Sequence, residues 1–375
     1  MIIIEKSDNM DKIKKLSQKI VEHSLKINDK DKVLITYQSP NCNDLVIELV
    51  KDISQKGAIC HVKLVDPIVN KELLMTTDEK RASLLGEYTK FEVEHFTSFI
   101  SIKYSTNDFE DNEVQNSIRN MIGKETRKYD DIRINKRKWV LLNYPSMLDA
   151  HKAKMSMEKF REFSLDAMTA NYDELEKRIE PLKKLMEKTD RVRIVGPNTD
   201  ITFSIKDIPV VPCCGESNLP DGEIFTAPVK DSVNGVITYN TPSPYQGEIF
   251  NNVSLTFENG KIIDATCQGN EEKLAEIFNT DEGSKYVGEF SLGLNSNILD
   301  PMGDILYDEK IIGSIHFTPG QAYEDADNGN KSRIHWDLVL IQRPEYGGGE
   351  IYFDDVLIRK DGLFVIDELK QLNYK

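Results

Sequence analysis

Helical and extended hydrophobic patterns alternate along roughly the first 190 residues, which predicts an α/β domain with a largely parallel sheet. The first helix is indicated by apolar residues at helical spacing, namely Ile13, Leu16, Ile20 and Val21. The polar residues 7–9 precede them, and we expect these residues to cap the start of that helix. The apolar run at residues 32–37 then predicts a buried strand.

The next elements continue this alternation. We expect a helix over residues 44–56, ended by Gly57, and a strand over residues 58–65. This succession is the βαβ pattern of a Rossmann-like domain, but the sequence lacks the GxGxxG and P-loop motifs, so a nucleotide site is not supported. Further along, Ser156 is expected to cap a helix, and Pro181 to kink or restart another.

The pattern changes after about residue 190, where turn signals between short apolar runs predict hairpins. Three such turns are expected, at residues 220–222, 259–260 and 360–362. We therefore expect two domains: residues 1–190 form the Rossmann-like α/β domain, and residues 191–375 form a strand-rich α+β domain that binds metal and carries the catalytic site.

Charge and composition restrict the classes of partner. The formal net charge of −15 argues against a nucleic-acid surface, and acidic residues interrupt the one basic run, at residues 124–138. Neither a signal-peptide core nor a run of about 18 apolar residues is present, so we expect a cytoplasmic protein without a membrane segment. The five cysteines are scattered and are expected to be reduced thiols.

The sharpest chemical signal is the pair His335 and Asp337, within an apolar run over residues 333–342 that predicts a buried strand. Residues two apart on a strand point to the same face, so these side chains should project together. A single hydrogen-bonded His–Asp pair would be the default interpretation. His316 changes it, because this histidine lies on a second apolar run, residues 311–317, and buried imidazoles need partners that a metal can supply.

Two isolated glutamates complete the candidate set. Glu223 and Glu289 each stand beside a glycine and among apolar residues, unlike the solvated acidic runs elsewhere in the chain. Together with the two histidines and the aspartate, they form a mixed nitrogen and oxygen ligand set of the kind that binds Zn, Co or Mn. Two such ions, about 3.5–4 Å apart, require several carboxylates, at least one of which bridges them.

These residues carry a resemblance to a known family. Four segments are similar, in this order, to the metal-site motifs of the aminopeptidase T and aminopeptidase S metallopeptidases: residues 222–228, 288–293, 316–323 and 330–337. Residues 199–201 and 153–163 resemble other parts of that family. The resemblance therefore covers essentially the whole chain, and its specificity comes from the four metal-site motifs.

The resemblance implies a hydrolase that removes residues from the N-termini of peptides and holds two divalent metal ions per chain. Its ligands fall on six residues: Glu223, Glu289, His316, Tyr323, His335 and Asp337. Glu289 is the expected bridge, Glu223 is also the expected proton shuttle, and the phenol of Tyr323 is expected to bind a metal or steady the tetrahedral intermediate. The resemblance also implies a homodimer with an enclosed site, and a preference for leucine or other apolar N-terminal residues.

One departure from the family concerns the substrate pocket. Only 11 residues separate Tyr323 from His335, and the loop over residues 324–329 is short and acidic, whereas longer relatives carry a larger loop. An alternative function also stays open. His316, His335 and Asp337 are the residue types that hold mononuclear non-haem iron in ring-cleaving dioxygenases. A single iron requires neither Glu223 nor Glu289, whereas two hydrolytic ions require both.

Overall fold

The computed structural model describes residues 2–374. Contacts divide the chain into two compact units. The first comprises Met1–Thr169 and Gly215–Pro220, and the second comprises Ala170–Cys214 and Asp221–Lys375. The chain thus passes from one unit to the other near residue 170 and returns briefly to the first. The expected division into domains at residue 190 stays a prediction.

The first unit is built on a five-stranded sheet in which all neighbouring strands are parallel. Its order is β2 (Ile59–Leu64), β1 (Lys32–Tyr37), β3 (Ser98–Lys103), β4 (Lys138–Asn143) and β8 (Asn218–Leu219). The predicted parallel sheet is confirmed, and the runs at residues 32–37 and 58–65 form β1 and β2 as expected. Parallel strands require crossover connections, which the intervening helices provide.

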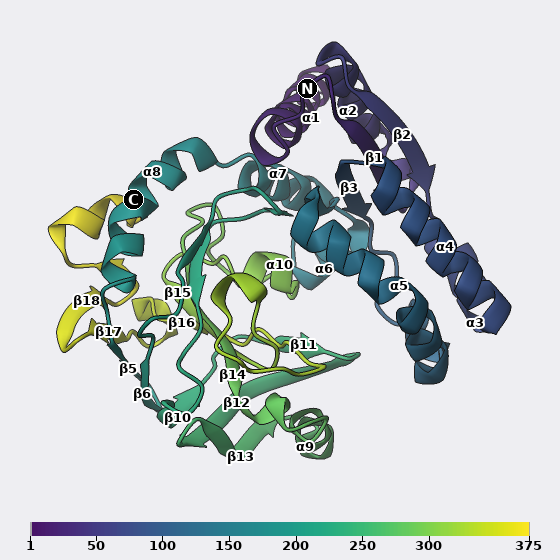
Figure 1. Ribbon diagram of the computed structural model, residues 1–375. Helices are drawn as coiled ribbons and strands as arrows, with labels where there is room; N and C mark the ends of the chain where they lie inside the picture. The colour runs from purple at the N-terminus through teal and green to yellow at the C-terminus, as the bar shows by residue number, and fades with distance from the viewer. Residues whose placement is uncertain (1, 375) are drawn as a thin grey trace. The chain divides into compact units, whose positions relative to one another are not determined.

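The helices of the first unit are α1 (Ile2–Gln18), α2 (Asn43–Gln55), α3 (Pro67–Met75), α4 (Glu79–His95), α5 (Asn116–Lys136), α6 (Met147–Lys152) and α7 (Met157–Met168), with the short helices η1 (Lys19–Ser24), η2 (Pro40–Cys42) and η3 (Glu110–Glu113). Figure 1 shows α1 beside α2 and α4 beside α5. Leu34, Phe99 and Val93 form a buried cluster with residues of α5. Val33 and Ile35 are also buried, and they face the other side of the sheet because successive strand residues alternate.

Local predictions for these helices were mostly right. The hydroxyl of Ser156 accepts a hydrogen bond from the Lys159 backbone N–H and caps α7. Pro181 lies inside the continuous helix α8 of the second unit, not at a restart. The expected cap at residues 7–9 was wrong, because α1 already begins at Ile2 and runs through those residues.

The second unit contains a nine-stranded antiparallel sheet. Its strands are β11 (Ser243–Tyr245), β12 (Glu248–Glu258), β10 (Asn234–Thr238), β6 (Thr199–Ser204), β5 (Arg191–Gly196), β17 (Glu350–Phe353), β18 (Val356–Lys360) and β19 (Leu363–Phe364), with β13 (Lys261–Gln268) paired to β12. The predicted hairpins at residues 259–260 and 360–362 are confirmed, since they join β12 to β13 and β18 to β19.

A second antiparallel sheet of this unit is buried at almost every position. Its order is β16 (Val339–Ile341), β15 (Ser314–Pro319), β14 (Val287–Gly293), β9 (Glu223–Thr226) and β7 (Val211–Cys213). Phe203 of the nine-stranded sheet packs against Phe290 and Phe317 of this sheet, with ring centroids 5.0 and 4.9 Å apart. The two sheets of the second unit therefore share an aromatic core. The polar residues on the five-stranded sheet of this unit are buried.

The remaining helices of the second unit are α8 (Tyr172–Met186), α9 (Glu271–Phe278), α10 (Ile305–Asp308), η4 (Gly283–Lys285), η5 (Glu324–Ala326), η6 (Pro344–Tyr346) and η7 (Asp367–Leu372). Three sequence predictions need correction here. Residues 220–222 are not a hairpin turn, because they join β8 to β9 in different sheets. Of the strand expected over residues 333–342, only β16 pairs with a neighbouring strand, and His335 forms a single isolated bridge. The strand expected from residue 311 begins at Ser314.

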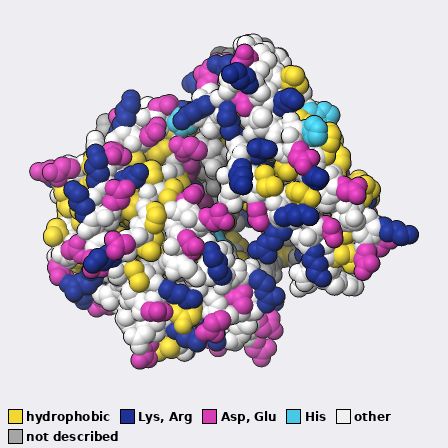
Figure 2. All heavy atoms as spheres, in the orientation of Figure 1, with side chains coloured by type: hydrophobic (Ala, Val, Ile, Leu, Met, Phe, Trp, Pro, Cys, Tyr) yellow, Lys and Arg dark blue, Asp and Glu magenta, His cyan; other side chains and the backbone are white. Residues whose placement is uncertain are grey.

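On the face drawn in Figure 2, acidic and basic side chains are interspersed rather than gathered into a basic patch. Across residues 2–374, none of the helices combines the length and the apolar character needed to cross a membrane.

Candidate metal centre

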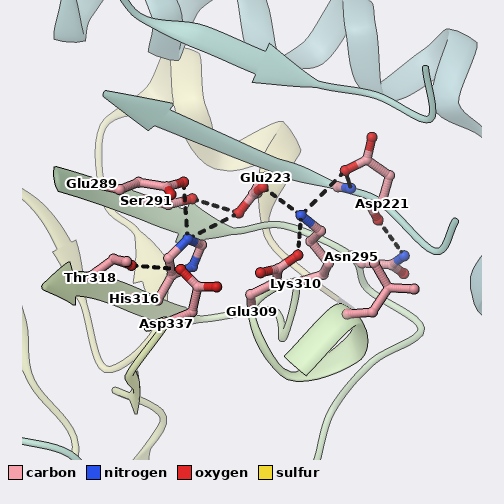
Figure 3. Close-up of polar contacts among 12 residues, drawn as sticks. Asp221, Glu223, Glu289, Ser291, Asn295, Glu309, Lys310, His316, Thr318 and Asp337 are labelled. Atoms are coloured by element: carbon pink, nitrogen blue, oxygen red, sulfur yellow. Dashed lines mark hydrogen bonds and ion pairs between the residues drawn. The ribbon is translucent and has the colours of Figure 1, made fainter. Parts of the chain in front are cut away.

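Strand register brings the predicted residues together. In the pairing of β14 with β15, Glu289 is opposite Thr318 and Ser291 is opposite His316. In the pairing of β14 with β9, Gly293 is opposite Glu223. Figure 3 shows the side chains of Glu223, Glu289 and His316 pointing toward one another from these three adjacent strands.

Two glycines are required beside the predicted glutamates. Gly222 has φ +117°, a conformation that other residues rarely adopt, and it turns the chain directly into Glu223. At Gly288 a Cβ atom would come within 2.5 Å of the carbonyl oxygens of Gly320 and Gln321. The ladder is also irregular between Val287 and Glu289. The glycine before each glutamate therefore allows a close backbone approach at the site.

His316 lies at the centre of the cluster and is 1 % exposed. Its Nε2 is 3.2 Å from Glu289 Oε1 and 3.4 Å from Glu223 Oε2. Its Nδ1 is buried and has no hydrogen-bond partner among the described residues. A buried ring nitrogen without a partner is costly in a protein interior, and coordination to a metal is one way to satisfy it.

His335 is held in a defined orientation. Its Nδ1 is 2.8 Å from the carbonyl oxygen of Gln321, so this nitrogen must carry the proton and donate. Its Nε2 then faces Glu289 Oε2 at 3.3 Å and Asp337 Oδ1 at 3.2 Å. In the neutral ring this Nε2 presents a lone pair toward two carboxylates, an arrangement that requires a cation. A histidine oriented through its other nitrogen is typical of metal ligands.

Two hydroxyl groups orient the carboxylates from behind. Ser291 donates to Glu223 Oε2 at 2.8 Å, and Thr318 donates to Asp337 Oδ1 at 2.7 Å. Both hydroxyl-bearing residues are fully buried on the strands that carry Glu289 and His316. Such contacts fix the direction of ligand oxygens before an ion binds.

Three charged residues at the cluster were missed from the sequence, namely Asp221, Glu309 and Lys310. Lys310, only 1 % exposed, places its ammonium 2.5 Å from Glu223 Oε1, 2.8 Å from Glu309 Oε1 and 3.6 Å from Asp221 Oδ1. Both Lys310 and Glu309 lie just after α10, in a charged segment that is typical of an exposed turn. The only signal that could have found them is their place shortly before the strand that carries His316.

The electrostatics of the cluster follow from burial and close opposite charge. Burial lowers the pKa of His316, but the carboxylates of Glu223 and Glu289 outweigh burial and raise this pKa to about 9. Burial raises the pKa of Glu289, but His316 and His335 outweigh it and lower that pKa below its ordinary value. Burial also raises the pKa of Glu309, to about 8. Protonated imidazoles balance the carboxylates here, and a metal ion would take over that balance by displacing the protons.

The donor atoms form four groups in which all members lie within 4.8 Å of one another. These groups are Glu223–Glu289–His316, Glu289–His335–Asp337, Glu309–His316–Asp337 and Cys213–Asp221–Glu223. The first two share Glu289, as expected for a bridging carboxylate. The donor set and the unsatisfied ring nitrogen thus fit divalent metal ions of the Zn, Co or Mn type.

Five of the six predicted ligands occur in these groups, and the sixth, Tyr323, lies beside one of them. Its ring packs against that of His335, with centroids 4.6 Å apart, and against Phe225 at 5.7 Å. The side chain is 49 % exposed, so it lies where the cluster meets solvent. Its assignment as a ligand stays a prediction.

Comparisons with known proteins identify the family. A family model described as thermophilic metalloprotease (M29) matches residues 9–348. Aminopeptidase AmpS of Bacillus subtilis (strain 168) is 40 % identical over 129 residues, which cover 33 % of this chain and 30 % of that protein. The aligned part therefore spans less than a third of that relative's length.

Two solved structures have a similar fold. Wild-type AmpT from Thermus thermophilus superposes with a TM-score of 0.77 at 19 % identity, covering 95 % of this chain and 99 % of that one. The 2,5-dihydroxypyridine dioxygenase from Pseudomonas putida KT2440 superposes with a TM-score of 0.62 at 14 % identity, covering 95 % and 98 %. The mixed α/β fold is thus shared with both proteins, whereas the family match over most of the length decides membership. The chain belongs to the thermophilic metalloprotease (M29) family.

Proposed function

We propose that this protein is a metal-dependent aminopeptidase that hydrolyses the N-terminal peptide bond of peptides with the help of two divalent ions. The observation that carries the proposal is the pair of donor groups that share the buried Glu289. One position comprises Glu223, Glu289 and His316, and the other comprises Glu289, His335 and Asp337. Their mixed nitrogen and oxygen donors suit Zn, Co or Mn. Divalent ions held there would supply Lewis-acid chemistry that activates water near neutral pH and polarises a carbonyl.

The chain's own residues orient and neutralise the site. Thr318, Ser291 and the Gln321 carbonyl fix the directions of Asp337, Glu223 and His335. We assign proton transfer to Glu223 at its Oε2, which faces His316 and accepts a hydrogen bond from the hydroxyl of Ser291, because its Oε1 is held by the buried ammonium of Lys310. Tyr323 is half exposed beside His335, so its hydroxyl is assigned to the carbonyl oxygen of the substrate as negative charge develops there.

Restriction to the first peptide bond would arise from recognition of the free amine. The cluster is rich in carboxylates, and its accessible side is formed by Tyr323 and His335, which are 49 % and 21 % exposed. A protonated or metal-bound amine would be favoured there by charge, whereas an acetylated amine carries no charge and adds bulk. Peptides with free N-termini are therefore the proposed substrates.

The dioxygenase remains the second candidate because a dioxygenase shares the fold. A mononuclear iron site would need His316, His335 and Asp337 to converge on one ion. Within the part of the chain that the structure describes, none of the four donor groups contains all three. Three of the four groups instead contain Glu223 or Glu289, the two acids that a single iron would not need, which favours the hydrolase.

Elemental analysis of the purified chain after loading with Zn²⁺, Co²⁺ or Mn²⁺, combined with peptide cleavage, tests the proposal. We expect two ions per chain and cleavage of leucyl-anilide, but no cleavage of its N-acetylated form. A single iron that resists exchange would favour the dioxygenase. Equal hydrolysis of the free and acetylated substrates would contradict aminopeptidase action.

Four further properties are proposed, of which the homodimer comes from the family resemblance and the others from the sequence. The protein is proposed to be a homodimer in the cytoplasm, with a Rossmann-like first domain and with zinc or cobalt as the working metal. Light scattering of the purified chain would test the homodimer, and a monomeric mass at micromolar concentration would contradict it.

A further inference from the structure

Lys310 is the only lysine among the described residues that is fully buried, and it lies within the candidate metal centre. Its ammonium contacts Glu223 Oε1 at 2.5 Å and Glu309 Oε1 at 2.8 Å, and it is 3.6 Å from Asp221 Oδ1 (Figure 3). An ammonium is strongly hydrated in water, and its burial is tolerated only where carboxylates replace that hydration. Here three carboxylates surround it. Lys310 is therefore a fixed cation, tethered to the backbone, inside a cluster of acids.

The charges of the cluster indicate what this cation does. Five carboxylates lie together, with side chains at most 13 % exposed: Asp221, Glu223, Glu289, Glu309 and Asp337. When all are ionised they carry five negative charges. Two divalent ions and one ammonium carry five positive charges, which equal the charge of the fully ionised cluster, whereas three divalent ions would carry six. The lysine thus takes the place of a further metal.

Lys310 also differs in its contacts with the two proposed metal positions. It contacts Glu223, which belongs to the first position and also to the donor group Cys213–Asp221–Glu223. It makes no ion pair, among the described residues, with Glu289, His335 or Asp337, which form the second position. An ion at the first position would compete with the ammonium for Glu223 and be repelled by it, whereas an ion at the second position would not share a ligand with it.

We propose that Lys310 is a built-in cation that fills the donor group Cys213–Asp221–Glu223 and makes the two metal positions unequal. The position at Glu289–His335–Asp337 binds its ion tightly, and the position that uses Glu223 binds its ion weakly and exchanges it. This inference rests on the proposed function only in requiring that the cluster binds divalent metal. Lys310 acts as a positioning residue, since it works through Glu223.

Titration of the metal-free full chain with Co²⁺, followed by calorimetry, tests the inference without measuring activity. For the natural chain we expect two ions per chain with dissociation constants at least about tenfold apart. In Lys310→Met the ammonium is lost but the aliphatic chain remains. We expect the weaker ion to bind at least about tenfold more tightly in this variant, because a competitor for Glu223 has gone. Lys360→Met, which removes an exposed lysine of β18, should leave both constants unchanged.

Thermal unfolding supplies a second measurement. The metal-free Lys310→Met variant should unfold at a lower temperature than the natural chain, because three buried carboxylates lose their cation. Saturating Co²⁺ should restore more of the unfolding temperature in the variant than it adds to the natural chain. If Lys310→Met does not fold, Lys310→Gln retains a hydrogen-bond donor without the charge and should tighten the weaker ion in the same way.

The results separate this inference from the proposed function. Two ions of equal affinity in the natural chain, or unchanged constants in the folded Lys310 variants, would overturn the role of Lys310 while leaving a dinuclear aminopeptidase intact. A natural chain that binds no divalent ion would instead overturn the proposed function itself.

Discussion

Two buried acidic side chains, one from each unit of the molecule, have opposite surroundings. Asp31 of the first unit is 5 % exposed, and its oxygens accept hydrogen bonds from Thr97, Ser98 and the Asn28 backbone and pair with Lys138. Glu289 of the second unit is 3 % exposed and faces two imidazoles, His316 and His335. The carboxylate of Asp31 therefore has its hydrogen-bond partners within the protein. The carboxylate of Glu289 is held among groups that are themselves proposed metal ligands.

This difference teaches how to distinguish a structural acid from a functional one. A buried carboxylate surrounded by hydroxyl, backbone and ammonium donors is satisfied without any ligand, and it connects the segments that supply the donors. A buried carboxylate that shares its surroundings with ring nitrogens lacking other partners is satisfied only by protons or by metal. Asp31 should therefore contribute to stability alone, and Glu289 to metal binding and catalysis.

The largest effect is expected from Glu289→Ala. The loss of the shared ligand should release the second ion and reduce kcat/KM at least about 100-fold, since even partners of ligands contribute 10–100-fold. Elemental analysis and leucyl-anilide turnover measure the outcome. Glu258→Ala, which changes an exposed residue of β12, is the control, and near-normal turnover in Glu289→Ala would contradict the dinuclear site.

Asp31→Asn should produce the converse result. Burial raises the pKa of Asp31, but Lys138 and the surrounding donors outweigh burial and lower this pKa below its ordinary value. The carboxylate therefore stabilises the fold above the unfolded pKa of about 3.9, and this contribution is lost as the pH falls through the lower folded value. We expect a loss of about 2 kcal/mol in the free energy of unfolding at pH 7.

Denaturation of Asp31→Asn at several pH values measures this loss. The difference in the free energy of unfolding between the variant and the natural chain should become smaller in acid, and the metal content should stay unchanged. Asp29→Asn, at an exposed neighbouring position, is the control. A difference that persists at the lowest pH, or a change in metal content, would contradict the structural role.

A smaller effect is expected from a pair of threonines in the same buried sheet. Thr318 donates to Asp337 Oδ1 at 2.7 Å, whereas the hydroxyl of Thr226 is buried and has no hydrogen-bond partner within residues 2–374. Thr318→Val should weaken metal binding about 10–100-fold, because Asp337 loses its orientation. Thr226→Val should leave metal binding and stability unchanged. Metal titration of both variants decides the question, and equal effects would show that hydroxyl burial alone, not the contact with Asp337, is responsible.

The sequence could predict features that depend on local pattern. The alternation of helix and strand signals predicted the parallel sheet, because crossover units are nearly contiguous in sequence. Residues 259–260 predicted their hairpin because the paired strands lie on either side of them. Five of the six proposed ligands also lie in the donor groups, since each is an isolated polar residue in an otherwise apolar segment.

Features that depend on distant partners could not be predicted in this way. Lys310 reads as a solvated residue, and its burial depends on carboxylates that include Glu223, 87 positions earlier. The turn at residues 220–222 has hairpin chemistry, but a local signal does not determine which sheet receives the next strand. Residues 334–338 are apolar enough for a strand, yet only His335 forms a bridge there, because apolar character predicts burial rather than pairing.

The smallest effect is expected from exposed acidic residues that lie outside the donor groups of the metal centre. Glu324 and Asp325 are exposed on η5, directly after Tyr323, and water satisfies them. They should favour substrates with a basic N-terminal residue over leucine by roughly 2–5-fold, the range of an exposed ion pair. Salt at about 1 M, with a Debye length of about 3 Å, should abolish the preference, and so should the double variant Glu324→Gln/Asp325→Asn at low salt. Lysyl- and leucyl-anilides compared at both ionic strengths provide the measurement, with leucyl-anilide turnover as the internal control. If lysyl-anilide is still preferred in the double variant or at high salt, buried carboxylates of the metal centre select the substrate, and the exposed loop does not.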